Sequence, residues 1–397
     1  MTTITSASPA CNVCGKTALR EVLHLPAFPL NSRYLKTPSW EKYLADFTLH
    51  ACQACSHLQG ISAMALSSIY NTEYDYASGS DGVSARQKWL LSRASYFAKG
   101  KQYNRVIEIG CNNLSLMKGL RASGIAAKHW IGIDPVPLAS PVDGVTFING
   151  YSQDVDIPHF DPSLPDLVVA DQVFEHIPAL NSVLTDLNGK VGAGSSYMVC
   201  VPSLELLVEN LSFHNIIHEH LNYFSVKSMR NLFEPNGMAL EHSELNNSQT
   251  VGYLLQMWNR PDGVKPVEME CADPAELLVE FDAKYRYFLD SLRLTSSFLN
   301  NQFAGSSCYG FGASDITSQL AYFANTDFSI LRYILDDTPY KQNKFMPLVH
   351  SMVVGPSQVS DLSKAVIFVT APQANRPIVK RLSELNVRKI ILPFSLM

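Results

Sequence analysis

The chain has 397 residues, of which 46% are hydrophobic and 17% charged, and its formal net charge is −5. This length exceeds one ordinary domain, so we expect two or three domains with separate cores. The small negative charge and the lack of a long Lys/Arg run argue against nucleic acid and anionic lipid as partners. No stretch reaches the roughly 18 apolar residues that span a bilayer. We therefore expect a cytoplasmic protein that acts on a small molecule as a monomer or a weak homodimer.

Two Cys-x-x-Cys pairs stand near the N-terminus, at Cys11, Cys14, Cys52 and Cys55. The other four cysteines are scattered, which is not a disulfide framework. Four thiolates in two such pairs suit a closed tetrahedral zinc site, which stabilises a small fold and leaves no position open for catalysis. Residues 1–75 are thus predicted to form a structural zinc module, with four reduced, metal-free thiols as the alternative. His57 would be superfluous as a fifth ligand, and we expect it at the surface.

The middle of the chain alternates short apolar runs with helical stretches. Strands are predicted at residues 105–109, 130–134, 166–170 and 196–201, and a helix at residues 114–123. This alternation is typical of a doubly wound parallel α/β sheet. We expect it to form a domain over residues 76–245.

Six residues at or just after the ends of these strands are candidates for cofactor binding. They are Glu108, Gly110, Asn112, Asp134, Asp171 and Gln172. Positions 112 and 115 lack the glycines of the dinucleotide fingerprint, which weakens the case for a nicotinamide enzyme. Asp134 ends the second strand, where a carboxylate can accept hydrogen bonds from the ribose of an adenosine. The pattern favours S-adenosylmethionine as the cofactor.

Residues 246–397 predict a second, Rossmann-like α/β domain. A long helix with an apolar stripe begins after Asp273 and Pro274. Strands are predicted beyond it at residues 307–312, 333–336, 365–370 and 389–393.

Three histidines and a carboxylate fall within seven positions of the middle segment. The catalytic candidates are His214, His218, Glu219 and His220. Imidazole is well matched to proton abstraction near neutral pH, and a carboxylate can orient it or polarise a substrate hydroxyl. The spacing is not the His-Glu-x-x-His of a helical zinc protease.

These motifs together resemble the sugar C-methyltransferases of deoxysugar biosynthesis. The resemblance rests on the cysteine pairs, on His-Glu-His-Leu-Asn-Tyr-Phe-Ser at 218–225 and on Leu-Asp-Asp-Thr-Pro-Tyr-Lys-Gln at 335–342. It covers nearly the whole chain and implies a zinc-binding domain, a class I methyltransferase domain and a C-terminal Rossmann-like domain. It also implies methyl transfer from S-adenosylmethionine to carbon 3 of a nucleotide-linked 4-keto-deoxysugar. His220 would remove the proton beside the ketone, and Glu219 would hydrogen-bond the sugar.

The resemblance further implies a set of substrate-binding residues. They are Asn222, Tyr223, Gly310, Gly312, Lys341 and His350. The chain departs from the family pattern at His214, Ile217, Ile316, Thr317, Asn113 and Leu114. Ile217 replaces the tyrosine that usually precedes His-Glu-His, and Ile316-Thr317 replaces a Lys-Gly pair that could contact a diphosphate. O- or N-methylation of another sugar or metabolite, and a non-catalytic cofactor-binding homologue, are the alternatives.

Overall fold

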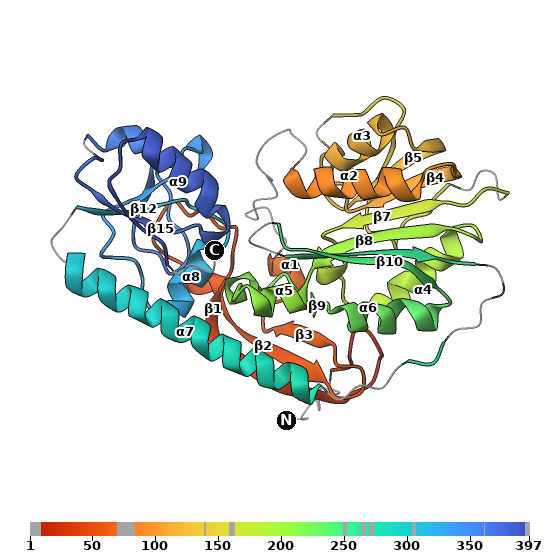
Figure 1. Ribbon diagram of the computed structural model, residues 1–397, viewed down its shortest axis with the longest axis horizontal. Coiled ribbons are helices and arrows are strands. Elements are labelled where there is room, and N and C mark those ends of the chain that lie inside the picture. Colours follow the sequence, from red (N-terminus) through yellow and green to blue (C-terminus); the bar gives the residue numbers. More distant parts are fainter. Residues whose placement is uncertain are drawn as a thin grey trace, which may run out of the picture.

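The computed structural model describes residues 9–69, 84–138, 140–158, 163–248, 252–261, 263, 267–269, 274–303, 307–360 and 362–393. These residues form three sheets and the helices that pack on them (Figure 1). The N-terminal sheet lies at the base between the other two, which form the upper right and upper left of the view. The expected boundary at residues 75 and 76 lies outside the described residues.

The N-terminal sheet is antiparallel and has the order β1-β2-β3-β9. Its strands are β1 (Leu19–Pro29), β2 (Leu44–Cys52), β3 (Leu58–Ser62) and β9 (Asn222–Tyr223). The short helix α1 (Leu66–Ile69) follows β3. The fourth strand therefore comes from a segment about 160 residues later in the chain, so the N-terminal module is completed by the next domain.

The central sheet has seven strands in the order β10-β11-β8-β7-β4-β5-β6. They are β4 (Gln102–Ile109), β5 (Ala126–Asp134), β6 (Thr146–Asn149), β7 (Leu167–Asp171), β8 (Ser196–Pro202), β10 (Ala239–Asn246) and β11 (Tyr253–Asn259). β11 runs antiparallel to both of its neighbours, and the five strands from β8 to β6 are parallel. The predicted doubly wound sheet is thus confirmed. Its last strand lies beyond residue 245, where we expected the domain to end.

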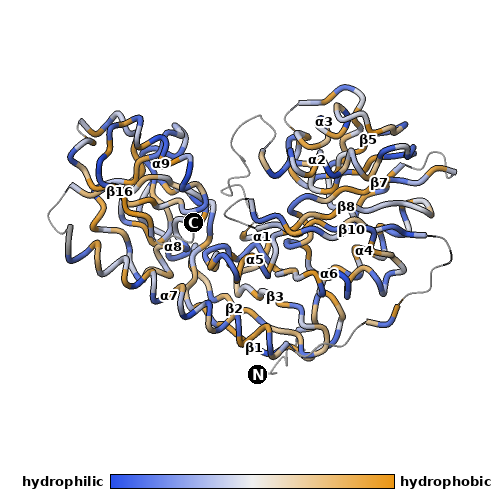
Figure 2. The backbone as a smooth tube through the Cα atoms, in the orientation of Figure 1, coloured by the Kyte–Doolittle hydropathy of each residue, from blue (hydrophilic) through white to orange (hydrophobic). Residues whose placement is uncertain are grey.

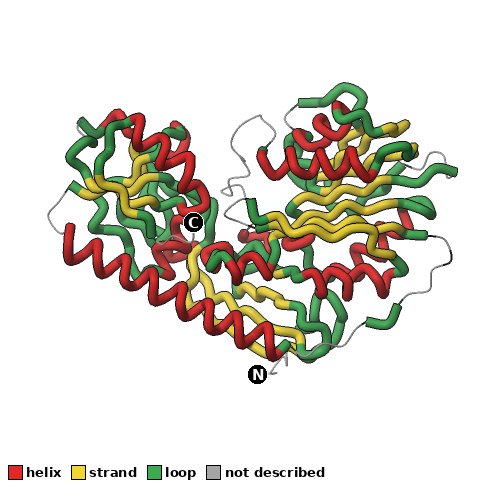
Figure 3. The backbone as a smooth tube through the Cα atoms, viewed as in Figure 1, coloured by secondary structure: helices red, strands yellow, loops and turns green. Residues whose placement is uncertain are grey.

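Helices cover both faces of the central sheet (Figure 3). They are α2 (Ala85–Phe97), α3 (Ser115–Ala122), α4 (Leu180–Lys190), α5 (Leu204–Glu209) and α6 (Val226–Phe233). Consecutive residues of a strand point to opposite faces. Val106 accordingly packs in the core under α2 and α3, and Ile107 packs in the core under α4 and α6. Figure 2 shows the apolar segments that build these cores.

The C-terminal sheet is parallel and has the order β14-β13-β12-β15-β16. Its strands are β12 (Cys308–Phe311), β13 (Ile334–Leu335), β14 (Val353–Val354), β15 (Val366–Val369) and β16 (Lys389–Ile391), with helices α8 (Thr317–Phe323) and α9 (Asn375–Glu384). The predicted second α/β domain is confirmed. No helix within the described ranges combines the length and apolar character that crossing a membrane would require.

The long helix α7 (Ala275–Phe303) joins the domains from below. Its buried face carries Phe281, Phe288 and Leu292. They share one apolar cluster with Phe47 of the N-terminal sheet and Phe323 of α8. The expected core-facing stripe is therefore confirmed, and it packs against parts of two domains.

Gly60 in β3 stands where the sheet meets the segment before β9. A Cβ atom there would lie 2.5 Å from Phe47 Cζ and 2.6 Å from the carbonyl oxygen of His220. We expect Gly60→Ala to lower the free energy of unfolding by about 1–3 kcal/mol through overpacking. Urea unfolding followed by circular dichroism measures this.

The matched control is Gly189→Ala in α4, where an added Cβ meets nothing within 4 Å. This change should instead raise helix stability, by up to about 1 kcal/mol. Equal midpoints for Gly60→Ala and the unchanged protein would contradict the close approach at β3.

Candidate active site

Three carboxylates lie together at the carboxyl edge of the central sheet. Glu108 is near the end of β4, Asp134 ends β5 and Asp171 ends β7, and β4 lies between the other two strands. Ligands bind at this edge of open α/β sheets. The tertiary structure thus brings together carboxylates that the sequence separates by 63 residues (171 − 108).

Asp134 organises the turn after β4. Its Oδ2 accepts from the backbone N–H of Asn112 at 2.8 Å, and its Oδ1 accepts from that of Val136 at 2.8 Å. Gly110 and Asn112 both have positive φ, at 67° and 45°. Positive φ suits glycine and is tolerated by asparagine, which explains why these residue types stand in this turn.

Arg86 of α2 is a cation at this edge that the sequence gave no motif to find. Its Nη2 forms an ion pair with Asp171 Oδ2 at 3.1 Å, and its guanidinium lies 5.3 Å from the ring of Tyr253. Gln172 follows Asp171 with a φ of 61°, and its backbone N–H donates to the carbonyl of Cys200 at 2.9 Å. The edge therefore offers groups of both charges to a zwitterionic ligand.

Burial raises the pKa of all three carboxyl groups. Glu108 is buried, and its Oε2 has no hydrogen-bond partner among the described residues. Burial, followed by the charge of Asp171, raises the pKa of Glu108 well above its usual value. Burial also raises the pKa of Asp134 and of Asp171, while Arg86 opposes the shift at Asp171. These are environments in which a positively charged ligand is favoured.

His220 lies close to this edge on the loop before β9. The neighbouring Leu221 donates its backbone N–H to the carbonyl of Glu175 at 2.7 Å. Glu175 belongs to η2 (Phe174–His176), the turn that follows β7. Burial, followed by the nearby His176, lowers the pKa of His220 well below its ordinary value, so its imidazole is neutral at pH 7.

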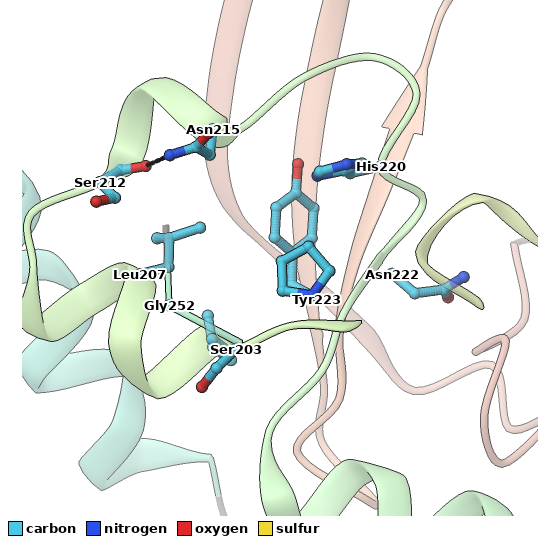
Figure 4. A pocket seen from close by; sticks show the side chains of 10 residues that line it. Ser203, Leu207, Ser212, Asn215, His220, Asn222, Tyr223 and Gly252 are labelled. Atoms are coloured by element: carbon cyan, nitrogen blue, oxygen red, sulfur yellow. Dashed lines mark hydrogen bonds between the residues drawn. The ribbon is translucent and has the colours of Figure 1, made fainter. Parts of the chain in front are cut away.

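The pocket beside His220 is lined by segments of the central domain and by β9 (Figure 4). Ser203, Leu207, Ser212, Asn215, Tyr223 and Gly252 line it with His220. The rings of His220 and Tyr223 have centroids 6.2 Å apart. Tyr223 Oη accepts from the backbone N–H of Ile217 at 3.3 Å. The hydroxyl of Tyr223 therefore lies beside the backbone of Ile217, the residue that replaces the family tyrosine.

Glu219 is completely buried next to the N-terminal module. The side-chain amide of Asn31 donates to its carboxylate. Burial raises the pKa of Glu219 to about 8, although the positive charge of Arg33 opposes the shift. Asn31 and Arg33 come from the segment after β1, so the N-terminal module contributes to the surroundings of the candidate site.

His218 and His214 are held differently from His220. His218 Nε2 donates to the carbonyl of Phe28 at 3.0 Å, and its Nδ1 accepts from the hydroxyl of Ser62 at 2.8 Å. Both ring nitrogens are thus occupied by the N-terminal sheet, and the structure gives His218 an anchoring role. His214 is buried with its ring 6.3 Å from that of Phe288 in α7.

Asn222 joins the N-terminal module to the central domain. Its Nδ2 donates to the carbonyls of Phe174 and Ile177, at 3.0 and 2.8 Å. Its Oδ1 accepts from Asn12 at 3.0 Å and lies 3.2 Å from His57 Nε2. The side-chain amide of Asn222 therefore links the central domain to the N-terminal module. The surface position expected for His57 is wrong, because this ring is fully buried against Asn222 and Phe224.

The glycine turn of the C-terminal domain repeats the arrangement at Asp134. Asp336 follows β13, and its Oδ2 and Oδ1 accept from the backbone N–H groups of Ala313 and Thr338, at 2.8 Å each. Gly312 has a φ of 97°, and a Cβ there would lie 2.6 Å from that of Ala371. Gly310 is equally tight, since a Cβ would lie 2.9 Å from a side-chain carbon of Ile334.

Lys341 lies at this turn and His350 does not. Lys341 Nζ donates to the carbonyl of Ala313 at 2.9 Å and lies 4.0 Å from Asp336. His350 precedes the amino end of β14, pairs with Asp327 at 3.1 Å and packs edge-on against Trp40. The glycine turn, by contrast, follows the carboxyl end of β12. The substrate residues expected in this domain are therefore only partly brought together.

The four N-terminal cysteines form one cluster. Their sulfur atoms all lie within 4.8 Å of one another, with 3.6 Å between Cys11 and Cys55 and 3.5 Å between Cys14 and Cys52. Tetrahedral zinc with bonds of about 2.3 Å places its sulfur ligands roughly 3.8 Å apart. Hydrogen bonds from Cys11 and Cys55 lower the pKa of Cys14. The donor set therefore fits a zinc ion.

Comparisons with known proteins agree with this architecture. A family model described as "Methyltransferase domain" matches residues 84–243, and one described as "C-methyltransferase C-terminal domain" matches residues 272–393. C-methyltransferase NovU of Streptomyces niveus is 25% identical over 273 residues, which are 64% of this chain and 63% of that protein. The match thus spans less than two thirds of the length of NovU.

Solved structures of other proteins resemble part of the chain. YcgJ of Bacillus subtilis is 12% identical with a TM-score of 0.37, covering 44% of this chain and 100% of that one. The 1,6-didemethyltoxoflavin-N1-methyltransferase of Burkholderia thailandensis, solved with 1,6-didemethyltoxoflavin and S-adenosylhomocysteine, is also 12% identical. Its TM-score is 0.35, over 45% of this chain and 82% of that one.

The sheet order, the carboxylate edge and the first family model define a class I methyltransferase domain. The second family model adds a domain described as a C-methyltransferase C-terminal domain, and the likeness to NovU agrees with it. The chain therefore carries a methyltransferase domain followed by a C-methyltransferase C-terminal domain.

Burial lowers the pKa of His214 to about 4. An unfolded histidine titrates near 6.5, so the unfolded chain takes up the proton first and the protein loses stability as the pH falls from about 6.5 to about 4. His214→Gln removes the titrating group and with it this pH-dependent loss of stability. Between pH 7 and pH 4 we therefore expect the free energy of unfolding to fall less in the variant than in the unchanged protein, by up to about 3 kcal/mol.

Urea unfolding of both proteins across this pH range measures the shift. Phe288→Leu, which alters packing beside His214 without removing a titrating group, should lower stability by a similar amount at each pH. A difference between His214→Gln and the unchanged protein that stays constant with pH would contradict the prediction.

Proposed function

We propose that this protein transfers a methyl group from S-adenosylmethionine to carbon 3 of a nucleotide-linked 4-keto-deoxysugar. The observation that carries the proposal is the neutral imidazole of His220, which lines a pocket in a methyltransferase domain. The next residue, Leu221, is hydrogen-bonded to η2, the turn that follows β7 at the cofactor edge. A neutral imidazole can accept the proton beside a ketone, and the resulting enolate carbon is nucleophilic.

The cofactor would lie along the carboxyl edge of β4, β5 and β7. Glu108, Gly110, Asn112, Asp134, Asp171 and Gln172 surround this edge. Asp134 uses one lone pair on each oxygen for the backbone, and a carboxylate oxygen has a second to offer ribose hydroxyls. Arg86 is placed to meet the carboxylate of the cofactor, and the acidic groups favour its ammonium.

The reaction needs a proton acceptor and a group that stabilises the enolate. The backbone N–H of His220 donates to the carbonyl of Ile217 at 3.2 Å, which helps to hold His220 in place. With a pKa of about 8, Glu219 is mostly protonated at neutral pH and can donate a hydrogen bond to a sugar oxygen. His218 anchors the loop that carries both residues to the N-terminal sheet. S-adenosylmethionine supplies the methyl group when bound.

The sugar nucleotide would extend toward the C-terminal glycine turn. Gly310 and Gly312 let the backbone of that turn pack closely against Ile334 and Ala371, and Lys341 adds a positive charge at its rim. Tyr34 and Tyr340 flank Lys341, with its Nζ 5.4 and 5.9 Å from their ring centroids. This supports a nucleotide as part of the substrate, because aromatic faces and a lysine suit a base and a phosphate.

Hydrogen–deuterium exchange at carbon 3 tests the base directly. With S-adenosylhomocysteine bound, the protein in D₂O should exchange the carbon-3 proton of a thymidine-diphosphate 4-keto-deoxysugar, since proton removal needs no methyl donor. His220→Gln should lower exchange and methyl transfer by about 100-fold or more while affinity for S-adenosylhomocysteine is unchanged.

His24→Gln, a change of an exposed histidine in β1, serves as the control and should leave exchange and transfer intact. Methyl transfer without exchange would point to an oxygen or nitrogen acceptor. Unchanged exchange in His220→Gln would remove His220 from the mechanism.

We also propose that the four cysteines hold a structural zinc ion. The dialysed protein should contain one zinc per chain by elemental analysis, and Cys52→Ala should lose it and unfold at lower temperature. Cys308→Ala, at an equally buried cysteine of β12, should keep the zinc. A zinc-free protein with an unchanged melting temperature would contradict this assignment.

A further inference from the structure

A second group of potential metal ligands lies at the candidate base. Glu175, His176 and His220 each offer one ligand atom, and these three atoms lie within 4.8 Å of one another. Glu175 Oε1 is 3.9 Å from His176 Nε2, and the ring centroids of His176 and His220 are 5.0 Å apart. η2 supplies two of these side chains, and the loop before β9 supplies the third.

A backbone hydrogen bond prepares the imidazole of His176 as a ligand. His176 Nδ1 lies 2.8 Å from the carbonyl oxygen of Glu219. A carbonyl only accepts, so Nδ1 carries the proton and Nε2 keeps its lone pair. Metal-binding histidines in proteins almost always donate their other ring N–H to such a partner, which fixes the tautomer.

The carboxylate of Glu175 points independently to a missing cation. This side chain is 1% exposed, and neither of its oxygens has a hydrogen-bond partner among the described residues. Arg86 is already paired with Asp171. A buried carboxyl group without a partner is costly whether it is protonated or ionised, and a bound cation, which takes the place of its proton, removes that cost.

We propose that Glu175, His176 and His220 form a site for a divalent transition-metal ion, separate from the cysteine cluster. Two nitrogens and one oxygen form a ligand set that zinc and its neighbours accept, with further positions open to water. The evidence for this site is geometric and does not depend on methyl transfer. Its effect on activity rests on the proposed function. The ion would bind the lone pair with which His220 accepts a proton, so the metal inhibits the enzyme.

Cobalt titration of the dialysed, full-length protein tests the site. The zinc content is measured first, and Co²⁺ binding is then followed by calorimetry. We expect one Co²⁺ per chain in addition to the resident zinc. Glu175→Gln should weaken its binding by more than about 100-fold, because loss of even an outer-shell partner costs about 10–100-fold. Glu241→Gln, which changes a partly exposed glutamate paired with Lys101, should bind Co²⁺ normally.

X-ray absorption of the cobalt-loaded, unsubstituted protein gives a readout that needs no variant. Nitrogen and oxygen ligands alone are expected, whereas sulfur ligands would assign the ion to the cysteines and overturn the proposal. The proposal would also be overturned if the protein bound no Co²⁺ in addition to its zinc, or if Glu175→Gln bound Co²⁺ as tightly as the unchanged protein. These outcomes do not depend on whether the protein methylates a sugar, so the two proposals can fail separately.

Discussion

The pairing of β9 with β3 is the constraint on which the candidate active site depends. β9 has two residues, yet it is the fourth strand of the N-terminal sheet. Just before it, Leu221 accepts from Gly60 at 3.1 Å and donates to Glu175 at 2.7 Å. His220 therefore precedes a residue that is fixed by backbone hydrogen bonds to β3 of the N-terminal sheet and to η2 of the central domain. Because such bonds have narrow distance ranges, the loop cannot move without breaking one of them.

The same ligand-binding device occurs in both α/β domains. Asp134 and Asp336 each end or follow the second strand of a β-α-β unit, and each accepts two backbone N–H groups, one of them from the turn after the first strand. This arrangement shapes the turn at a carboxyl edge, where open α/β sheets bind ligands. Two such edges in one chain agree with the proposed reaction, in which a cofactor would lie at one edge and a nucleotide-linked substrate at the other.

Burial sets the charge state of the candidate site. It raises the pKa of Glu175 and Glu219 to about 8, and it lowers the pKa of His176 to about 4. Near neutral pH the acids are therefore mostly protonated and the imidazoles are neutral. Such a site can donate a hydrogen bond from a carboxyl group and accept a proton on an imidazole, which is the combination that enolate chemistry requires.

The sequence determined the local features of this protein. Apolar runs of strand length predicted β4, β5, β7 and β8, and the residues at their ends predicted a cluster of polar side chains at one edge of the sheet. Cysteine spacing predicted the four-sulfur cluster. These predictions succeed because each depends on residues close together in the chain, and because parallel strands bring their carboxyl ends to one edge.

Tertiary structure decided the rest. Asn31, Arg86 and His176 carry no local signal, and they reach the site only through contacts between distant segments. His57 is buried by Asn222, 165 residues later, and β11 joins the central sheet by pairing with β8 across 50 residues. His350 shares a sequence segment with Lys341 but lies toward the other end of the strands. Burial and strand pairing across such distances depend on the packed whole, so neighbouring residues alone did not reveal them.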